Sequence, residues 1–232
     1  MHRFFVPKDQ IPVISGSDVH HIKDVLRMKI GGELELLDGT GKIYEARISG
    51  IKKDKIICKV LSMRTEETKL KVKITLAQCL PKAKKMELII QKCTELGVDR
   101  IIPILSERTI ARGEKLNRWR TIAKEAAEQS GRLTIPKISP LTRFEGVLKI
   151  KDQFDLALIP WELETKTTLK QVLTNQRPRH LLILIGPEGG FSRSEINFAK
   201  SAGFTSVSLG PSILRTETAG MALLAMIGYE YS

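Results

Sequence analysis

The feature that most limits the possible folds is the alternation of apolar runs with amphipathic helical patterns from residue 72 onward. Residues 181–185 read Leu-Leu-Ile-Leu-Ile, which is typical of a central parallel strand buried on both faces. Ser192 and Glu195 then form the pattern of a capping box, so a helix is expected to begin at Ser192. Strands and helices in this order predict an α/β domain with a parallel sheet.

The expected elements of that domain follow from the spacing of apolar residues. We expect strands at 72–78, 101–105, 154–159, 181–185 and 207–209, and helices at 84–96, 114–130, 169–173, from 192 and at 216–229. Gly97 and Gly131 follow two of these helices and suit their C-terminal caps.

The first 70 residues have a different pattern, dominated by short strands. We expect strands at 3–6, 33–37, 43–51 and 55–63, and a helix over 17–28 that is capped by Ser17 and turns Val25 inward. Strands at this close spacing predict a small barrel. The polar stretch at 64–71 is typical of a linker, which predicts domains at 1–70 and 71–232.

Composition narrows the class of protein. The 232 residues, 42% of them hydrophobic, are sufficient for a packed core and exclude disorder as the main state. The longest nearly apolar stretch, 219–229, is shorter than the roughly 18 residues of a membrane span. The N-terminus lacks the apolar segment of a signal peptide, and Cys58, Cys79 and Cys93 form no CxxC pair. We therefore expect a cytoplasmic protein with reduced thiols, no membrane partner and no metal.

The net charge of +12 is concentrated in the middle of the chain. Residues 71–151 carry 18 Lys or Arg and 8 Asp or Glu, whereas residues 152–232 carry 7 and 8. Such a surface favours a polyanionic partner, most commonly nucleic acid, over a surface that only improves solubility. Arg108 and Arg132 follow expected elements and are candidates for that partner, while Lys84 also fits an ordinary solvated helix face.

Two loops remain as candidate sites once common motifs are excluded. The sequence has no P-loop (GxxxxGKS/T), no GxGxxG after a strand, no GxSxG and no HExxH. The first loop, 185–191, places three glycines, a proline and an acid at the carboxyl end of the expected central strand, where open α/β sheets bind ligands. The alternative is a tight strand-to-helix connection that binds nothing.

The second loop, 209–219, again joins a strand to a helix. Ile213 and Leu214 are apolar loop residues that suit packing against a flat ring such as adenine. Arg215 is disfavoured at a helix N-terminus, so a functional role is expected for it, whereas Glu217 also fits the helix dipole. The following helix is apolar nearly all round, which predicts burial on more than one side and favours a homodimer.

These two loops, GPEGGFSRSEI at 186–196 and LGPSILRTETA at 209–219, resemble the C-terminal signatures of the RsmE-type ribosomal RNA methyltransferases. The stretches that resemble the same family in the same order are the N-terminal RFFV, 20–41, 91–109 and 118–132. The family methylates N3 of a uridine in 16S rRNA. Ser212 departs from its pattern, since the family usually carries arginine there.

The resemblance implies a SPOUT-type trefoil-knotted methyltransferase domain behind an N-terminal PUA-like RNA-binding barrel. It also implies S-adenosyl-L-methionine as the cofactor, 16S rRNA or the assembled small ribosomal subunit as substrate, and a homodimer through the C-terminal knotted region. The residues expected to bind the cofactor are Ile185, Gly186, Pro187, Glu188, Gly190, Leu209, Gly210, Ile213, Leu214, Thr216 and Ala219. Those expected to bind RNA are Arg3, Arg27, Lys82, Lys84, Arg108 and Arg132.

The implied chemistry requires that uridine N3 lose its proton before or during attack on the sulfonium methyl group. We hypothesise that Arg215 stabilises the negative charge on O2 and O4 of the uridinate, and that Glu217 orients Arg215 or takes the proton. Three alternatives stay open: a SPOUT ribose 2′-O-methyltransferase acting on tRNA or rRNA, a non-catalytic RNA-binding module, and an enzyme of small molecules with incidental basic charge.

Overall fold

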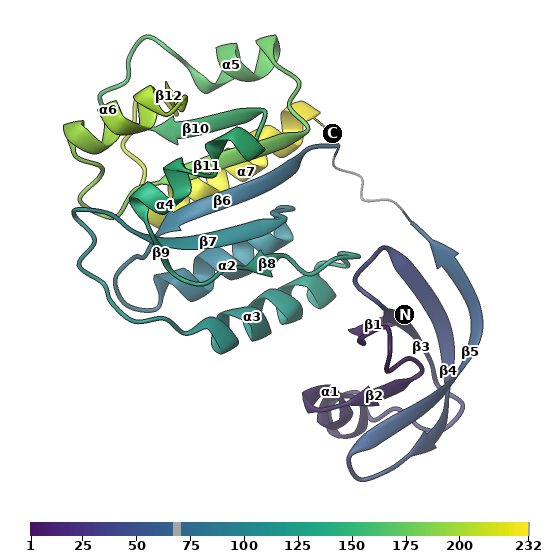
Figure 1. Cartoon of the computed structure of the whole chain (residues 1–232). Helices are drawn as coiled ribbons and strands as arrows, with labels where there is room; N and C mark the ends of the chain where they lie inside the picture. The colour runs from purple at the N-terminus through teal and green to yellow at the C-terminus, as the bar shows by residue number, and fades with distance from the viewer. Residues whose placement is uncertain (67–70, 232) are drawn as a thin grey trace. The chain divides into compact units, whose positions relative to one another are not determined.

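The computed structural model describes residues 1–66 and 71–231, which fall into two compact units (Figure 1). The first unit is Met1–Thr68 together with Ala127–Ile135, and the second is Lys69–Ala126 together with Pro136–Ser232. The expected boundary near residue 70 and half of the expected linker at 64–71 lie at 67–70, outside the described residues. The linker prediction is wrong at its start, because Arg64 and Thr65 end a strand. The sequence did not predict that 127–135 packs with the first unit.

Five strands form the sheet of the first unit within the described residues. They are β1 (His2–Phe5), β2 (Val13–Ser15), β3 (Glu33–Leu37), β4 (Lys42–Ile51) and β5 (Lys55–Thr65). The order is β1-β3-β4-β5-β2, with β1 parallel to β3 and the other pairs antiparallel. Two register shifts between β4 and β5 accompany the strong curvature of these strands (Figure 1), which wraps the sheet around its own core.

The predicted helix over 17–28 is wrong in its cap and in its end. A short α1 (Ser17–His20) passes directly into a π-helical turn, η1 (His21–Val25), and Gly16 at φ 75° occupies the N-cap without a side-chain hydrogen bond. The wider π turn rotates the following residues around the helix axis. Val25 therefore leaves the predicted apolar stripe and is 59% exposed.

Residues 127–135 complete the first unit through a small hydrophobic cluster and two polar contacts. The cluster consists of Phe5, Leu37, Ile43, Ala127 and Leu133. The Arg3 guanidinium donates to the Gly131 carbonyl at 3.0 Å, and the Phe5 backbone N–H donates to a Glu128 carboxylate oxygen at 2.9 Å. Arg3 also lies 2.6 Å from a Glu35 carboxylate oxygen of the neighbouring strand. Arg3, which the sequence assigned to RNA, thus has partners inside its own unit.

Seven strands form the sheet of the second unit within the described residues, and every pairing is parallel as predicted. They are β6 (Lys73–Cys79), β7 (Arg100–Leu105), β8 (Lys137–Ile138), β9 (Thr142–Arg143), β10 (Leu156–Pro160), β11 (His180–Ile185) and β12 (Thr205–Val207). The order is β12-β10-β11-β6-β7-β8, and β9 also pairs with β7. The sequence did not predict β8 and β9, since two residues are too few to show a period.

Helices cover both faces of this sheet. They are α2 (Lys85–Glu95), α3 (Leu116–Gln129), α4 (Phe144–Leu148), the 3-10 turn η2 (Lys151–Gln153), α5 (Leu169–Asn175), α6 (Arg193–Ser201) and α7 (Thr216–Tyr231). Residues of α2, α3, α5 and α7 share one core cluster, and residues of α4 and α6 share the other. Because helices cover both faces, β11 is buried on both sides, as its Leu and Ile run predicts. None of the described helices is long and apolar enough to cross a bilayer.

The final helix, α7, lies along β6 and β11 (Figure 1). It buries Gly220, Leu223, Leu224 and Ile227 against the sheet and neighbouring helices. Tyr229, however, is 87% exposed. One side of this apolar helix is therefore covered by the chain itself, and the other faces solvent in the single chain. The homodimer and the trefoil knot stay predictions.

Candidate active site

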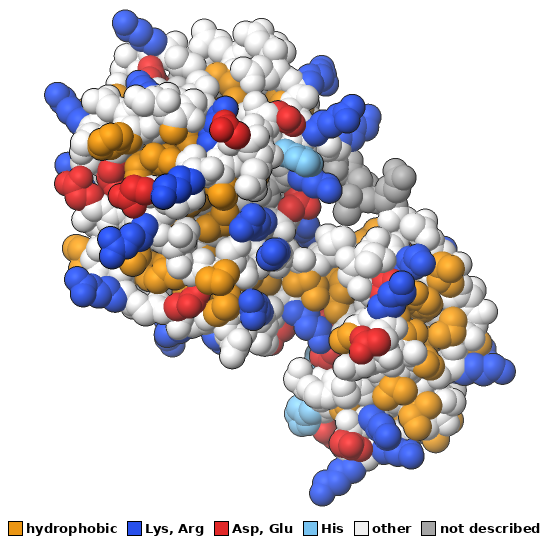
Figure 2. All heavy atoms as spheres, in the orientation of Figure 1, with side chains coloured by type: hydrophobic (Ala, Val, Ile, Leu, Met, Phe, Trp, Pro, Cys, Tyr) orange, Lys and Arg blue, Asp and Glu red, His pale blue; other side chains and the backbone are white. Residues whose placement is uncertain are grey.

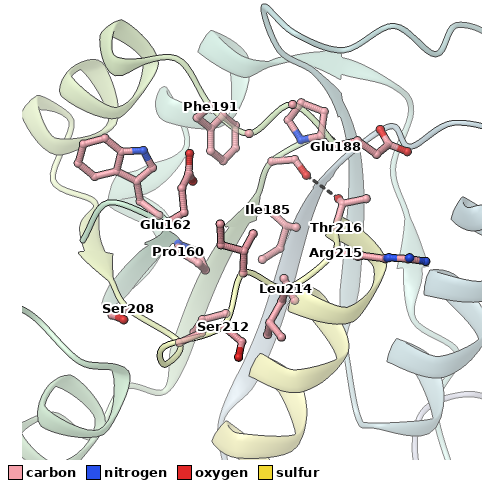
Figure 3. Close-up of a pocket in the computed structure, with 18 of the residues that line it drawn as sticks. Pro160, Glu162, Ile185, Glu188, Phe191, Ser208, Ser212, Leu214, Arg215 and Thr216 are labelled. Carbon is pink, nitrogen blue, oxygen red and sulfur yellow. Dashed lines mark hydrogen bonds between the residues drawn. The ribbon is translucent and has the colours of Figure 1, made fainter. Parts of the chain in front are cut away.

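A pocket of about 570 Å³ lies beyond the carboxyl ends of β10, β11 and β12 (Figure 3). This is the sheet edge where ligands of parallel α/β domains bind. The structure brings all residues expected to bind the cofactor to this one pocket: Ile185, Gly186, Pro187, Glu188, Gly190, Leu209, Gly210, Ile213, Leu214, Thr216 and Ala219. Sequence reasoning missed other residues that line it, which include Lys85, Pro160, Trp161, Glu162 and Ser208.

The glycine-rich loop requires its glycines because other groups approach its backbone. Gly190 has φ 66°, and a Cβ atom there would lie 3.2 Å from a Glu162 carboxylate oxygen. A Cβ on Gly186 would lie 3.2 Å from the Phe191 ring. The absence of side chains at these glycines therefore allows the Glu162 carboxylate and the Phe191 ring to lie close to the loop backbone, which a simple turn would not require.

The two predicted loops are joined by a buried hydrogen-bonded chain. Gln78, at the end of β6, donates its amide to the Thr216 hydroxyl at 2.9 Å, and that hydroxyl donates to the Gly186 carbonyl at 2.5 Å. Gln78 is fully buried. The first residue of α7 is thus bonded directly to the first loop, and Gln78 ties it to the central sheet.

A second set of contacts holds the glycine-rich loop from outside. The Arg108 guanidinium donates to the Gly189 carbonyl at 2.9 Å. Glu195 accepts the backbone N–H groups of Ser192 and Glu107, each at 2.9 Å, and Ser192 and Glu195 complete the predicted capping box. Arg108, expected to bind RNA, therefore also positions the candidate cofactor loop.

Arg215 and Glu217, expected to be catalytic, have different environments. Arg215 lines the pocket and is exposed, and its guanidinium points away from Pro160 and Glu162 (Figure 3). Glu217 lies behind the rim with only 14% of its side chain exposed, and Oε1 is 3.2 Å from the Lys85 ammonium. The ion pair found for Glu217 among the described residues is this one, so the expected Arg215–Glu217 contact is not what holds Glu217.

Electrostatics make Glu217 a weak proton acceptor. Burial raises the pKa of its carboxyl group, but its own backbone N–H, the Lys85 ammonium and the Arg215 charge together leave that pKa below its ordinary value of 4.5. A carboxylate with a lowered pKa holds a proton less readily. This favours a positioning role for Glu217 over proton abstraction.

The apolar lining is uneven. Leu209 and Leu214 pack against the core, whereas Ile213 is 83% exposed at the rim. Ser212, where the resembled family usually has arginine, is also exposed at this rim (Figure 3). Ile213 thus presents an exposed apolar side chain at the rim of the pocket.

Most of the chain matches known protein families. Residues 68–228 match the family described as RNA methyltransferase domain, and residues 14–61 match the RNA methyltransferase PUA domain. The ribosomal RNA small subunit methyltransferase E of Bacillus subtilis strain 168 is 34% identical and covers 99% of this chain and 97% of its own length. The chain belongs to the ribosomal RNA small subunit methyltransferase E family.

Solved structures of methyltransferases agree with this assignment. The methyltransferase E of Neisseria gonorrhoeae, solved bound to S-adenosyl methionine, is 33% identical with a TM-score of 0.88, covering 98% of this chain and 96% of that one. A Legionella pneumophila methyltransferase, solved with bound SAM, is also 33% identical with a TM-score of 0.88, covering 97% and 96%. The likeness thus extends over both units of this family member.

The residues expected to bind RNA divide between the two units. In the second unit, Lys82 and Lys84 are exposed in the segment before α2, and the Lys82 N–H donates to Glu188 of the pocket at 2.9 Å. In the first unit, Arg27 is exposed with φ 51° and Arg132 is half-buried. Figure 2 shows Lys and Arg side chains over the visible surface of both units. Among the residues described, no three His, Cys, Asp or Glu side chains are grouped to hold a metal.

Proposed function

We propose that this chain transfers a methyl group from S-adenosyl-L-methionine to N3 of a uridine in 16S rRNA of the small ribosomal subunit, giving 3-methyluridine. The observation that carries the proposal is the single pocket that gathers both signature loops in a chain similar over its whole length to ribosomal RNA methyltransferases. The proposal includes cytoplasmic location, which the three buried free thiols fit.

The pocket suits the proposed cofactor. Its volume of about 570 Å³ lies within the range of ordinary small-molecule sites. Ile185, Leu209 and Leu214 supply apolar surface, and the glycines let a ligand approach the loop backbone closely. The carboxylates of Glu162 and Glu188 suit a ligand that carries hydroxyl, ammonium and sulfonium groups. When bound there, S-adenosylmethionine supplies the methyl group on its sulfur.

The protein's share of the reaction is to bind, orient and stabilise charge. Uridine N3 is protonated at neutral pH, so the reaction passes through a species with negative charge on O2 and O4. Arg215, a permanent cation at the rim, is proposed to stabilise that charge. The two loops fix the geometry in which N3 faces the methyl group, and a paired target base is turned out of its stack to reach them.

RNA is proposed to bind through phosphate contacts with Arg27, Lys82, Lys84, Arg108 and Arg132. Each lost phosphate contact should reduce the slope of log K against log salt by about 0.7 to 0.9. Alanine variants at Arg27 and Lys82, compared with wild type across a salt series, test this. An unchanged slope removes the residue from the RNA interface.

A homodimer through α7 is proposed from its solvent-facing side. Met226 is 43% exposed and Tyr229 is 87% exposed on an otherwise apolar helix. Met226→Glu should therefore lower the mass measured by sedimentation from that of a dimer to that of a monomer. A wild-type chain that sediments as a monomer would contradict the proposal.

The deciding experiment transfers labelled methyl from S-adenosylmethionine to three substrates: unmodified small ribosomal subunits, free 16S rRNA and bulk tRNA. Nucleosides of the product are then separated. Label in 3-methyluridine of the small-subunit RNA supports the proposal. Label in a 2′-O-methyl nucleoside instead supports the ribose methyltransferase alternative and overturns the proposed position.

A further inference from the structure

Lys85 is a cation of the pocket that the sequence did not place at the cofactor site. It is the first residue of α2 and, from its position in the sequence, fits an ordinary solvated helix face. In the structure it lines the pocket with 35% of its side chain exposed. Its Nζ lies 3.2 Å from Glu217 Oε1 and 3.8 Å from Glu188 Oε1.

Its position carries an electrostatic cost. A cation in the first turn of a helix opposes the helix dipole, and Lys84 at the N-cap adds a second positive charge. The negative charge of the Glu217 carboxylate, on α7, offsets this cost through its ion pair with Lys85. Its second oxygen, Oε2, is buried without a hydrogen-bond partner among the described residues. Lys85 lines the pocket and Glu217 does not, so Glu217 can act on a ligand there through Lys85.

Lys85 in turn has hydrogen-bonding capacity left for a ligand. An ammonium group has three donors, and one points to Glu217. The 3.8 Å separation from Glu188 is too long for a hydrogen bond. An oxygen atom of a ligand can therefore take a second donor without breaking the contact with Glu217.

We propose that Lys85 is a catalytic residue whose ammonium donates a hydrogen bond to O2 or O4 of the target uracil, and that Glu217 is the positioning residue that holds it. This inference rests on the proposed function. The N3–H bond breaks and its proton passes to solvent water. The N3 electron pair forms the bond to the methyl carbon, and the carbon–sulfur bond breaks with its electrons remaining on sulfur. The Lys85 ammonium keeps its protons throughout.

The test measures single-turnover methyl transfer to small ribosomal subunits by the full chain across neutral to alkaline pH. Lys85→Met should lower the rate at neutral pH by about 10²- to 10³-fold, as loss of one charge-stabilising donor does elsewhere. The affinity for S-adenosylmethionine should stay at the wild-type value. The defect should shrink as pH rises, because hydroxide then supplies the uridinate that Lys85 otherwise stabilises. Lys85→Arg should recover part of the rate.

A second substrate tests the same point at constant pH, so that the protonation of groups on the enzyme does not change. Subunits reconstituted on rRNA that contains 5-fluorouridine carry a more acidic N3–H, so they should rescue Lys85→Met more than wild type. Glu217→Gln should give a smaller loss with the same pH dependence. Lys92→Met is the matched control, because Lys92 lies on the same helix and pairs with Glu95 at 2.9 Å, yet does not line the pocket.

Two results would overturn the inference. One is a Lys85→Met rate equal to that of Lys92→Met, or lowered by the same factor at every pH. The other is a weaker affinity for S-adenosylmethionine with a normal rate at saturation, which would make Lys85 a cofactor ligand. Failure of the proposed function is distinguishable from both, since the wild-type chain would then yield no 3-methyluridine.

Discussion

The hydroxyl of Thr216 donates to the carbonyl oxygen of Gly186 over 2.5 Å and so joins the first residue of α7 to the glycine-rich loop. The same hydroxyl accepts a hydrogen bond from the fully buried amide of Gln78. Because Gln78 belongs to β6, the two loops of the pocket share one rigid support. A change at Thr216 should therefore alter the pocket as well as the stability of the fold.

Thr216→Val removes the hydroxyl while keeping the shape of the side chain. It leaves the Gln78 amide and the Gly186 carbonyl each without this partner, which should lower the free energy of unfolding by about 1–3 kcal/mol. It should also weaken S-adenosylmethionine binding, because the loop loses its support. Urea unfolding and calorimetric titration measure the two effects. Thr216→Ser keeps the hydroxyl and is the control; equal losses in both variants would contradict the argument.

Gly190→Ala should damage the pocket through the backbone. The φ of 66° costs an L-residue about 1–2 kcal/mol. The new Cβ would also press on the Glu162 carboxylate from 3.2 Å. Gly189→Ala is the matched control, since its Cβ would make only an ordinary contact of 3.5 Å with Arg108 and its φ is not positive. Cofactor affinity should fall in the first variant and not in the second.

The sequence predicted the parts of this molecule that rest on local patterns. The apolar run of β11 and the capping box of Ser192 depend on neighbouring residues, and both were confirmed. The π turn at His21–Val25 was missed because its side chains do not differ from those of an α-helix. The sequence also did not predict that residues 127–135 belong to the first unit, because their packing depends on residues far away in the sequence, such as Phe5.

The candidate site divides in the same way. Both loops were located from their glycines and their places after strands. The ion-pair partner of Glu217 was not predicted. Lys85 lies far from Glu217 in the sequence and reaches it only because α2 and α7 pack together. Local spacing suggested Arg215 instead, but Arg215 lies just before α7 and its side chain points in a different direction from that of Glu217.

Glu164 should make stability depend on pH in the acid range. The Ser206 hydroxyl, the backbone N–H groups of Lys166 and Thr167 and the Lys200 charge lower its pKa from 4.5 to about 2, against the effect of burial. A lowered pKa in the folded state gives stability that is present above the ordinary pKa and lost as pH falls through the folded value. Urea midpoints should therefore decline between about pH 5 and pH 2.

Glu164→Gln should flatten part of that acid decline and lower stability near neutral pH. Asp152→Asn is its control, because the Asp152 side chain is 98% exposed. A decline that is identical in wild type and Glu164→Gln would show that other carboxylates cause it.

The cysteines should be inert in the folded protein. Burial raises the pKa of Cys79 and of Cys93 to about 12 and that of Cys58 to about 11, from an ordinary value of 9.0. Their thiols should therefore stay unmodified by a disulfide reagent at mildly alkaline pH and react once guanidinium unfolds the chain. Since a raised pKa means that the folded state holds its protons longer, stability should fall as pH rises above the ordinary thiol pKa. Rapid labelling of the native protein would contradict this.

Arg215→Ala should remove methyl transfer while leaving the cofactor site in place. The guanidinium is exposed at the rim and packs against no core cluster, so unfolding in urea should be unchanged. Loss of a charge-stabilising group should lower the single-turnover rate by about 10²- to 10³-fold at saturating S-adenosylmethionine. Arg177→Ala is the matched control, because Arg177 is an exposed arginine of the same unit that does not line the pocket. If Arg215→Ala keeps a rate close to that of Arg177→Ala, charge stabilisation by Arg215 is wrong, and Lys85 remains as the lining cation that can serve in that role.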